Sequence, residues 1–144
     1  MVVIGARRAK AAVLLAIFAL TCQAQGNQEL RNRLSDIVTA LSAGNPSNAM
    51  EPFDQSFKDY QKLSNYFTAL TNAYQVAAEV EVTDEQDTPD GIKLSVRWTL
   101  HLTDAGKNTE NRSADLTLQW VRKKGKWKIT DLAPLELFDP QQHK

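Results

Sequence analysis

Cysteine and histidine are scarce in this sequence, and their scarcity excludes several kinds of site. The chain has one cysteine, Cys22, and two histidines, His101 and His143. Cys22 lies in an N-terminal segment that we expect to be removed, which leaves no thiol for a disulfide or a thiolate metal site. Histidines 42 positions apart do not have the spacing of zinc or facial-triad ligands. The sequence also lacks a glycine-rich phosphate loop and a nucleophile elbow. It therefore predicts no metal and no cofactor.

The first 24 residues have the pattern of a secretory signal peptide. Arg7, Arg8 and Lys10 precede an apolar run over residues 11–20, and small residues follow that run. The run is shorter than the roughly 20 apolar residues that a membrane-spanning helix needs. We therefore expect an exported protein, periplasmic or secreted, with no stable membrane span after cleavage.

The cleavage site is predicted after Ala24, because Cys22 and Ala24 occupy the two positions where signal peptidase requires small residues. A lipid anchor on Cys22 is disfavoured, since Thr21 stands where lipoprotein signals have Gly, Ala or Ser. Cleavage removes three of the 17 basic residues and none of the 17 acidic ones, so the mature net charge is −3. A basic stripe is the usual footprint of a nucleic-acid-binding protein, and we expect no nucleic-acid partner.

Three helices are predicted in the first half of the mature chain. Residues 25–33 are polar and are expected to be flexible, and a single domain is predicted over residues 34–140. The first helix ends at Gly44 and Pro46, and Ser47 or Asn48 caps a short second helix. The third has the clearest apolar stripe. Its residues at helical spacing are Phe57, Tyr60, Leu63, Phe67, Leu70 and Tyr74.

From Val76 onward the apolar residues alternate with polar ones, which predicts strands. The expected strands begin at Val76, Ile92, Ala114 and Lys126, and the connections "DEQDTPDG", "TDAGKNTEN" and "KKG" separate them. Strands joined by short turns are antiparallel, and helices followed by such strands predict an α+β domain.

Three stretches carry a resemblance to a known family. These are "PFDQSFKDYQKLSNYFTAL", "VRWTLHL" and "GKWKITDLAPLELFDP". Together they resemble the nuclear transport factor 2-like (NTF2-like) superfamily, over roughly residues 30–140. The Phe-Asp before the third helix and the closing Pro-x-x-x-Phe-x-Pro are similar to those of small exported bacterial members of unknown function. The resemblance implies a cone in which three helices pack on a curved antiparallel sheet of about four strands.

Enzymes of this superfamily have reactive groups inside the cone, so the direction of each side chain matters. The strand face with Val96, Trp98 and Leu100 is expected to face the helices, which places His101 on the opposite face or at the rim. Asp131 shares the parity of Ile129 but stands where the last strand ends. Asp54 is a candidate general base, although a turn or cap role ahead of the third helix is favoured. Tyr60 and Tyr74 are weaker candidates for catalysis.

Two further surfaces are predicted. The resemblance implies a pocket in the cone, whose expected lining residues are Phe53, Phe57, Tyr60, Phe67, Trp98, Trp120 and Trp127. Core packing is the alternative role for at least two of these tryptophans. The polar sheet face is either solvated or an interface, and related folds often dimerise there. Its expected interface residues are Glu79, Arg97, Thr99, His101, Thr117 and Gln119.

The apolar tail after Pro134 is predicted to fold back and close one end of the cone. The basic turn "VRKKGKWK" is interpreted as protection of a sheet edge, with an anionic partner as the alternative.

Three functions remain open. The preferred one is a non-catalytic exported domain that binds a small apolar ligand or a partner protein in the cell envelope. The second is an isomerase, dehydratase or cyclase that uses Asp54 and a tyrosine. The third is an accessory module that docks through the outer sheet face. Because a fold hosts many functions, the sequence does not choose among them, although it favours a protein that is not an enzyme.

Overall fold

The computed structural model describes residues 14–141, and their side chains from residue 28 onward. The chain divides into two units, residues 1–32 and 33–144. The described backbone of the first unit is helical and belongs to α1 (Leu14–Ser42). The predicted signal peptide, with Cys22, and the terminal His143 lie outside the residues whose side chains are described.

None of the helices in the described part of the chain is long and apolar enough to cross a membrane.

The first helix differs from the prediction at its start and agrees with it at its end. Residues 25–33 were expected to be flexible, yet α1 runs through them. Residues such as Gln28, Glu29 and Arg31 have good helix propensity, so polarity alone does not oppose a helix there. α1 ends at Ser42, and Gly44 follows with a φ of 73°. That left-handed conformation suits glycine and commonly ends a helix.

Two helices follow α1. α2 (Pro46–Ala49) starts after Asn45, whose side chain accepts a hydrogen bond from the backbone N of Asn48 at 3.2 Å. The cap is therefore Asn45 and not Ser47 or Asn48, because proline prefers the first helical position. α3 (Tyr60–Ala73) begins three residues after Phe57 and buries Leu63, Phe67 and Leu70. These three positions are the centre of the predicted six-residue stripe. The predicted helix was too long at both ends, because Phe57 lies before α3 and Tyr74 is its extended C-cap.

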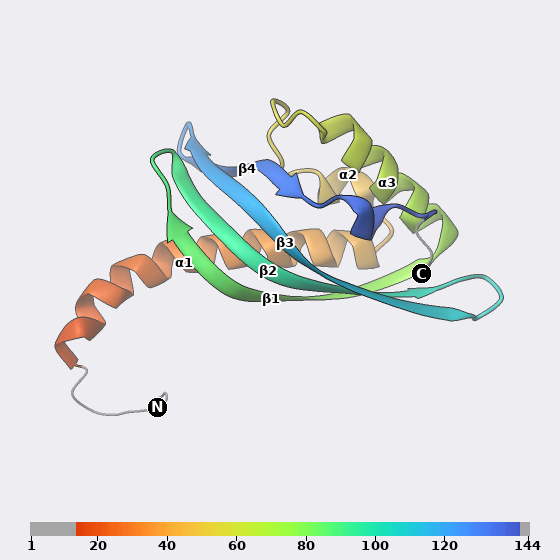
Figure 1. The fold of residues 1–144 in the computed structure, drawn as a ribbon, viewed down its shortest axis with the longest axis horizontal. Helices are drawn as coiled ribbons and strands as arrows, with labels where there is room; N and C mark the ends of the chain where they lie inside the picture. The colour runs from red at the N-terminus through yellow and green to blue at the C-terminus, as the bar shows by residue number, and fades with distance from the viewer. Residues whose placement is uncertain (1–13, 142–144) are drawn as a thin grey trace. The chain divides into compact units, whose positions relative to one another are not determined.

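Four antiparallel strands form one sheet in the order β1-β2-β3-β4 (Figure 1). They are β1 (Gln75–Asp87), β2 (Gly91–Thr103), β3 (Thr109–Lys123) and β4 (Lys126–Ala133). The predicted α+β order of helices and strands is thus confirmed. β1 and β3 are longer than expected, because residues 84–87 and 109–113 pair with β2 and do not form turns. Pairing with a neighbouring strand outweighs the low strand propensity of their acidic and amide side chains.

Alternation along the strands places apolar side chains on the inner face. In β2, Leu94, Val96, Trp98, Leu100 and Leu102 are buried, and in β3 Leu116, Leu118 and Trp120 are buried. His101 lies on the opposite, partly exposed face, as the alternation predicts. Among the described strand residues, three carboxylates have a register that places them on the inner face: Glu85, Asp87 and Glu110. All three lie near strand ends and are at least partly exposed.

A bulge in β4 overturns the parity expected for Asp131. Trp120 pairs with Ile129, whereas Gln119 pairs with Asp131, so Thr130 is an extra residue in β4. Such an insertion reverses the alternation beyond it. Asp131 is therefore exposed and Leu132 is buried.

The C-terminal tail packs into the domain as predicted. After Ala133 it forms a short 3-10 helix, η1 (Glu136–Phe138), that runs beside α3 (Figure 1). Leu135, Leu137 and Phe138 are buried. These three tail residues are therefore part of the core.

Candidate functional site

An aromatic cluster fills the space between the helices and the sheet. Phe138 is fully buried, and its ring stands edge-on to Phe67 and Trp98, with centroids 5.2 and 5.3 Å away. Phe53 packs on Phe57 and Phe67 at 6.0 and 6.3 Å. These geometries are the preferred arrangements of aromatic pairs, so the rings stabilise one another as a core.

Six of the seven residues expected to line a pocket are buried in the core: Phe53, Phe57, Phe67, Trp98, Trp120 and Trp127. Phe53 and Tyr60 border a polar pocket of about 450 Å³. Its other lining residues are Ser47, Met50, Glu51, Asp54, Gln55 and Lys128. The structure therefore brings the catalytic candidates Asp54 and Tyr60 to one pocket, while Tyr74 lies at the other end of α3 as its C-cap.

The Asp54 carboxylate is already engaged in this pocket. Its Oδ2 atom accepts hydrogen bonds from the backbone N of Ser56 at 3.0 Å, from the Ser56 hydroxyl and from Lys123 Nζ at 3.1 Å. The hydrogen bond from the Ser56 side chain and the bond from Lys123 lower the pKa of Asp54 to about 2. A carboxylate with so low a pKa is a weak proton acceptor, and it acts here as a turn residue.

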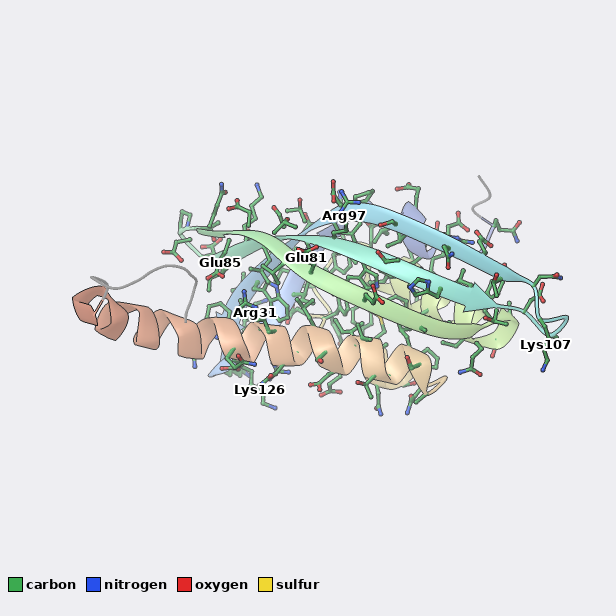
Figure 2. The ribbon with its side chains drawn as sticks, turned by 90° about the horizontal axis from the view of Figure 1, so that it is seen from below. Arg31, Glu81, Glu85, Arg97, Lys107 and Lys126 are labelled. Carbon is green, nitrogen blue, oxygen red and sulfur yellow. The ribbon has the colours of Figure 1, made fainter. Side chains whose placement is uncertain are left out.

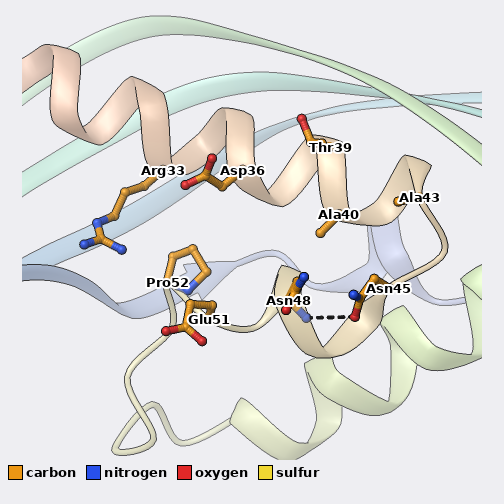
Figure 3. Close-up of a pocket in the computed structure, with 9 residues that line it drawn as sticks. All are labelled: Arg33, Asp36, Thr39, Ala40, Ala43, Asn45, Asn48, Glu51 and Pro52. Carbon is orange, nitrogen blue, oxygen red and sulfur yellow. Dashed lines mark hydrogen bonds between the residues drawn. The ribbon is translucent and has the colours of Figure 1, made fainter.

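A second pocket, a groove of about 370 Å³, lies between α1 and the segment after it (Figure 3). Its lining combines small and polar side chains: Arg33, Asp36, Thr39, Ala40, Ala43, Asn45, Asn48, Glu51 and Pro52. The α2 cap, the hydrogen bond from Asn48 N to Asn45 Oδ1, closes one side. No pattern in the sequence pointed to this groove, because it forms only where the chain after α1 folds back beside that helix.

Arg112 is a buried cation on the inner face, and its side chain is only 7% exposed. Its Nε donates to Glu110 Oε2 at 2.7 Å. Its Nη1 donates to the carbonyl oxygens of Leu137 at 3.0 Å and Asp139 at 2.7 Å. Its Nη2 is buried and has no hydrogen-bond partner among the described residues. The guanidinium therefore holds the tail on both sides of Phe138, and its Nη2 nitrogen has no acceptor in the described part of the chain.

Sequence reasoning missed Arg112, although a signal for it exists. Arg112 has the parity of Ala114, Leu116 and Trp120, so extending the alternation by one step would have placed it inside. The segment "KNTEN" before it resembles a turn, and for that reason the strand was expected to begin only at Ala114.

The outer face of the sheet is polar and ordered into cross-strand rows. Glu81, Arg97 and Asp115 stand opposite one another on β1, β2 and β3. Figure 2 shows Glu81 and Arg97 extending from the sheet. Arg97 pairs with Asp115 at 3.1 Å, and the two side chains are 52% and 72% exposed. In such open positions an ion pair contributes little to stability, and both groups stay accessible to a partner.

The other expected interface residues also lie on this outer face. His101 Nδ1 is 2.7 Å from Asn111 Oδ1 and its Nε2 is 3.9 Å from Glu79. Thr99 and Ser113 share a hydrogen bond of 3.1 Å. Thr117 pairs with Ser95, and Gln119 donates to Thr88 Oγ1 at 2.9 Å. Cross-strand pairs of this kind keep the polar face ordered.

Among residues 28–141, whose side chains are described, no group of three or more His, Cys, Asp or Glu side chains is placed to hold a metal ion.

The helices, the antiparallel sheet and the tail that closes their interior together define the NTF2-like fold. No family model matches the sequence, and a comparison with curated proteins found no similar one. Comparison with solved structures shows the fold directly. The resemblance predicted from the sequence is therefore confirmed for the fold.

Three of these structures illustrate the similarity. A conserved protein from Planctomyces limnophilus matches with a TM-score of 0.69 at 7% identity, over 76% of this chain and 94% of that one. An NTF2-like superfamily protein from Salmonella enterica matches with a TM-score of 0.62 at 7% identity, over 76% and 89%. A type 2 hexachlorocyclohexane dehydrochlorinase matches with a TM-score of 0.62 at 12% identity, over 76% and 84%. At these identities the similarity concerns the fold and not the activity.

Proposed function

We propose that this chain is an exported, non-catalytic binding domain that docks through the outer face of its sheet, and that its partner there is a second copy of itself. The observation that carries the proposal is the chemistry of the inner face. Among the described residues, its buried part has no carboxylate and no histidine, and the buried cation Arg112 is engaged with the tail.

An enzyme with this fold is the alternative, because Asp54 and Tyr60 border one pocket. Two features count against it. The low pKa of Asp54 makes it a weak base, and its Oδ2 atom already accepts hydrogen bonds from Ser56 and Lys123. The pocket borders the aromatic cluster at Phe53, but most of its other lining residues are polar, so it does not offer the apolar enclosure that an apolar substrate needs.

The charge pattern of the outer face supports a second copy as the partner. An interface between two identical chains is usually isologous, so residue i of one copy meets residue j of the other and j meets i. Arg97 on β2 and Asp115 on β3 stand in the same row. A two-fold axis that runs along the strands between β2 and β3 would place Arg97 of each copy over Asp115 of the other.

A different axis would place like charges together. A two-fold axis across the strands, through the same row, would bring Arg97 over Arg97 and acidic β1 over β1. Like charges brought together at an interface cost affinity, so the first arrangement is favoured.

The experiment compares four proteins by analytical ultracentrifugation: the mature chain, Arg97→Glu, Asp115→Arg and the double variant Arg97→Glu/Asp115→Arg. We expect a dimer for the mature chain, weaker association by about tenfold or more for each single variant, and recovery in the double variant. Lys107→Glu, in the turn that joins β2 to β3, is the matched control. It also reverses a charge but lies away from the Arg97 row, so it should not change the association. A monomer for the unmodified chain at high concentration would contradict the proposed partner.

Export is tested separately. We expect the full chain, expressed in a bacterium, to be recovered outside the cytoplasm with Gln25 as its first residue. Recovery of the full-length mass from the cytoplasm would contradict export and leave the binding proposal unaffected.

A further inference from the structure

We propose that the tail segment Leu135–Asp139 occupies a ligand site within its own domain, and that an aromatic carboxylate binds there by displacing it. The site consists of the space that Phe138 fills beside Phe67 and Trp98, together with the guanidinium of Arg112. This inference goes beyond docking through the outer face and does not depend on it.

The segment is attached in a way that permits displacement. Strand pairing ends at Ala133. Within the segment the backbone hydrogen bonds are local, from Phe138 N to Leu135 O at 2.9 Å and from Asp139 N to Glu136 O at 3.1 Å. Three apolar side chains and Arg112 hold it to the rest of the domain. A segment without ladder hydrogen bonds can open locally while the sheet stays paired, so its displacement costs these side-chain contacts and not the strand pairing.

The aromatic part of the ligand follows from what Phe138 contacts. The rings of Phe67 and Trp98 stand nearly perpendicular to Phe138, with interplanar angles of 89° and 88°. Both present an edge-to-face environment that a ligand's phenyl ring reproduces without rearrangement. An apolar space lined in this way accepts small aromatic molecules once its own ring is absent.

The carboxylate follows from the geometry of Arg112. Its Nη1 donates to two carbonyl oxygens, and its buried Nη2 has no partner in the described residues. A carboxylate can accept hydrogen bonds from Nη1 and Nη2 at the same time. Such a bidentate, charge-assisted pair is stronger than hydrogen bonds to neutral carbonyl oxygens. Glu110 continues to accept the hydrogen bond from Nε, on a different side of the guanidinium from Nη1 and Nη2. The Glu110 side chain is 32% exposed, so solvent reduces its repulsion of the ligand's carboxylate.

A neutral ligand lacks this advantage. Displacing the segment removes both carbonyl acceptors from Arg112, and a buried charged donor without an acceptor is strongly unfavourable. The site should therefore discriminate between an acid and the alcohol of the same shape.

The test uses the mature full chain and two probes, 3-phenylpropionate and 3-phenylpropan-1-ol, followed by NMR at the Trp98 indole N–H and the Phe138 amide. We expect saturable binding of the acid at both signals, at least about tenfold tighter than binding of the alcohol. Absence of saturable binding to the unmodified chain, or equal affinity for the two probes, would overturn the proposal.

Two variants distinguish the contribution of the ring site from that of the Arg112 cation to ligand binding. Phe138→Ala should tighten binding of the acid about tenfold, because the segment no longer competes for the ring site. Arg112→Met should abolish the preference for acid over alcohol. If Arg112→Met fails to fold, Arg112→Lys provides the same test, because a lysine cannot form the bidentate pair and the preference should fall. A preference that survives both Arg112 changes would overturn the assignment of the carboxylate.

The outcome is distinguishable from that of the docking proposal. Arg97→Glu should leave probe binding unchanged, and Arg112→Lys should leave the association state unchanged. Probe binding that disappears with Arg97→Glu would place the ligand on the outer face and contradict this inference.

Discussion

The Nη1 atom of Arg112 lies 2.7 Å from the carbonyl oxygen of Asp139, and this contact joins the end of the chain to the third strand. The same nitrogen reaches the carbonyl of Leu137, so the buried cation holds the backbone before and after Phe138. Burial of a guanidinium is unfavourable unless its donors are satisfied, and here the tail supplies most of the acceptors. Arg112 and the tail therefore stabilise each other.

The tail should contribute strongly to thermal stability. Deleting residues 134–144 removes Leu135, Leu137 and Phe138 from the core and leaves Arg112 without two acceptors. We expect the melting temperature, measured by circular dichroism, to fall by more than about 10 °C. Deleting only residues 141–144 is the control and should change it little. An unchanged melt of the longer deletion would refute the structural role of the tail.

Phe138 should account for much of that effect. Its ring is fully buried between Phe67 and Trp98, and truncating a buried Phe to Ala costs about 3–5 kcal/mol. We expect Phe138→Ala to lower the free energy of unfolding in urea by that amount. Glu136→Ala, on the exposed side of the same 3-10 helix, should change it by less than about 0.5 kcal/mol. Equal effects of the two changes would contradict the packing described here.

Gly91 should be intolerant of a side chain. A Cβ built at Gly91 would lie 2.0 Å from the carbonyl oxygen of Trp120, a backbone atom that cannot move aside. Gly91→Ala is expected to destabilise the domain by about 1–3 kcal/mol in urea unfolding. Gly106→Ala is a matched control, since its nearest atoms are side-chain ends at 3.4 Å and it should have little effect. A neutral Gly91→Ala would show that the β2–β3 register is wrong at this end.

Asp54 should make stability depend on pH in the acid range. Its pKa is lowered in the folded state to about 2, chiefly by the hydrogen bond from the Ser56 side chain and then by Lys123. A lowered pKa stabilises the fold above the ordinary value of 3.8, and that contribution is lost as the pH falls toward 2. Asp54→Asn should thus lower the unfolding free energy at pH 7 by about 1 kcal/mol.

The comparison of the two proteins across pH checks the cause. We expect the difference between the unmodified chain and Asp54→Asn, measured by urea unfolding, to shrink between pH 4 and pH 2. A difference that stays constant over this range would mean that the ionised carboxylate is not the stabilising group.

Much of the fold could be predicted because it depends on local periodicity. The stripe of Leu63, Phe67 and Leu70 and the alternation around Trp98 result from the geometry of a helix and a strand. The outward position of His101 followed from that alternation. The lengths of β1 and β3 could not be predicted from alternation, because residues 84–87 and 109–113 become strand only by pairing with β2.

The candidate site residues likewise include some that could be predicted from local sequence and some that could not. That Asp54 acts as a turn carboxylate was predictable from its place before a helix. The exposure of Asp131 was not, because one extra residue in β4 reverses the alternation and leaves no mark in the sequence.

The order of helices and strands follows from the spacing of apolar residues, which can be read directly from the amino-acid sequence. The tertiary structure alone decided that Arg112 and the carbonyls around Phe138, more than 20 residues apart in the chain, form one buried contact. The physical reason is that periodicity is a property of neighbouring residues, whereas partners for a buried charge depend on which distant segments fold together.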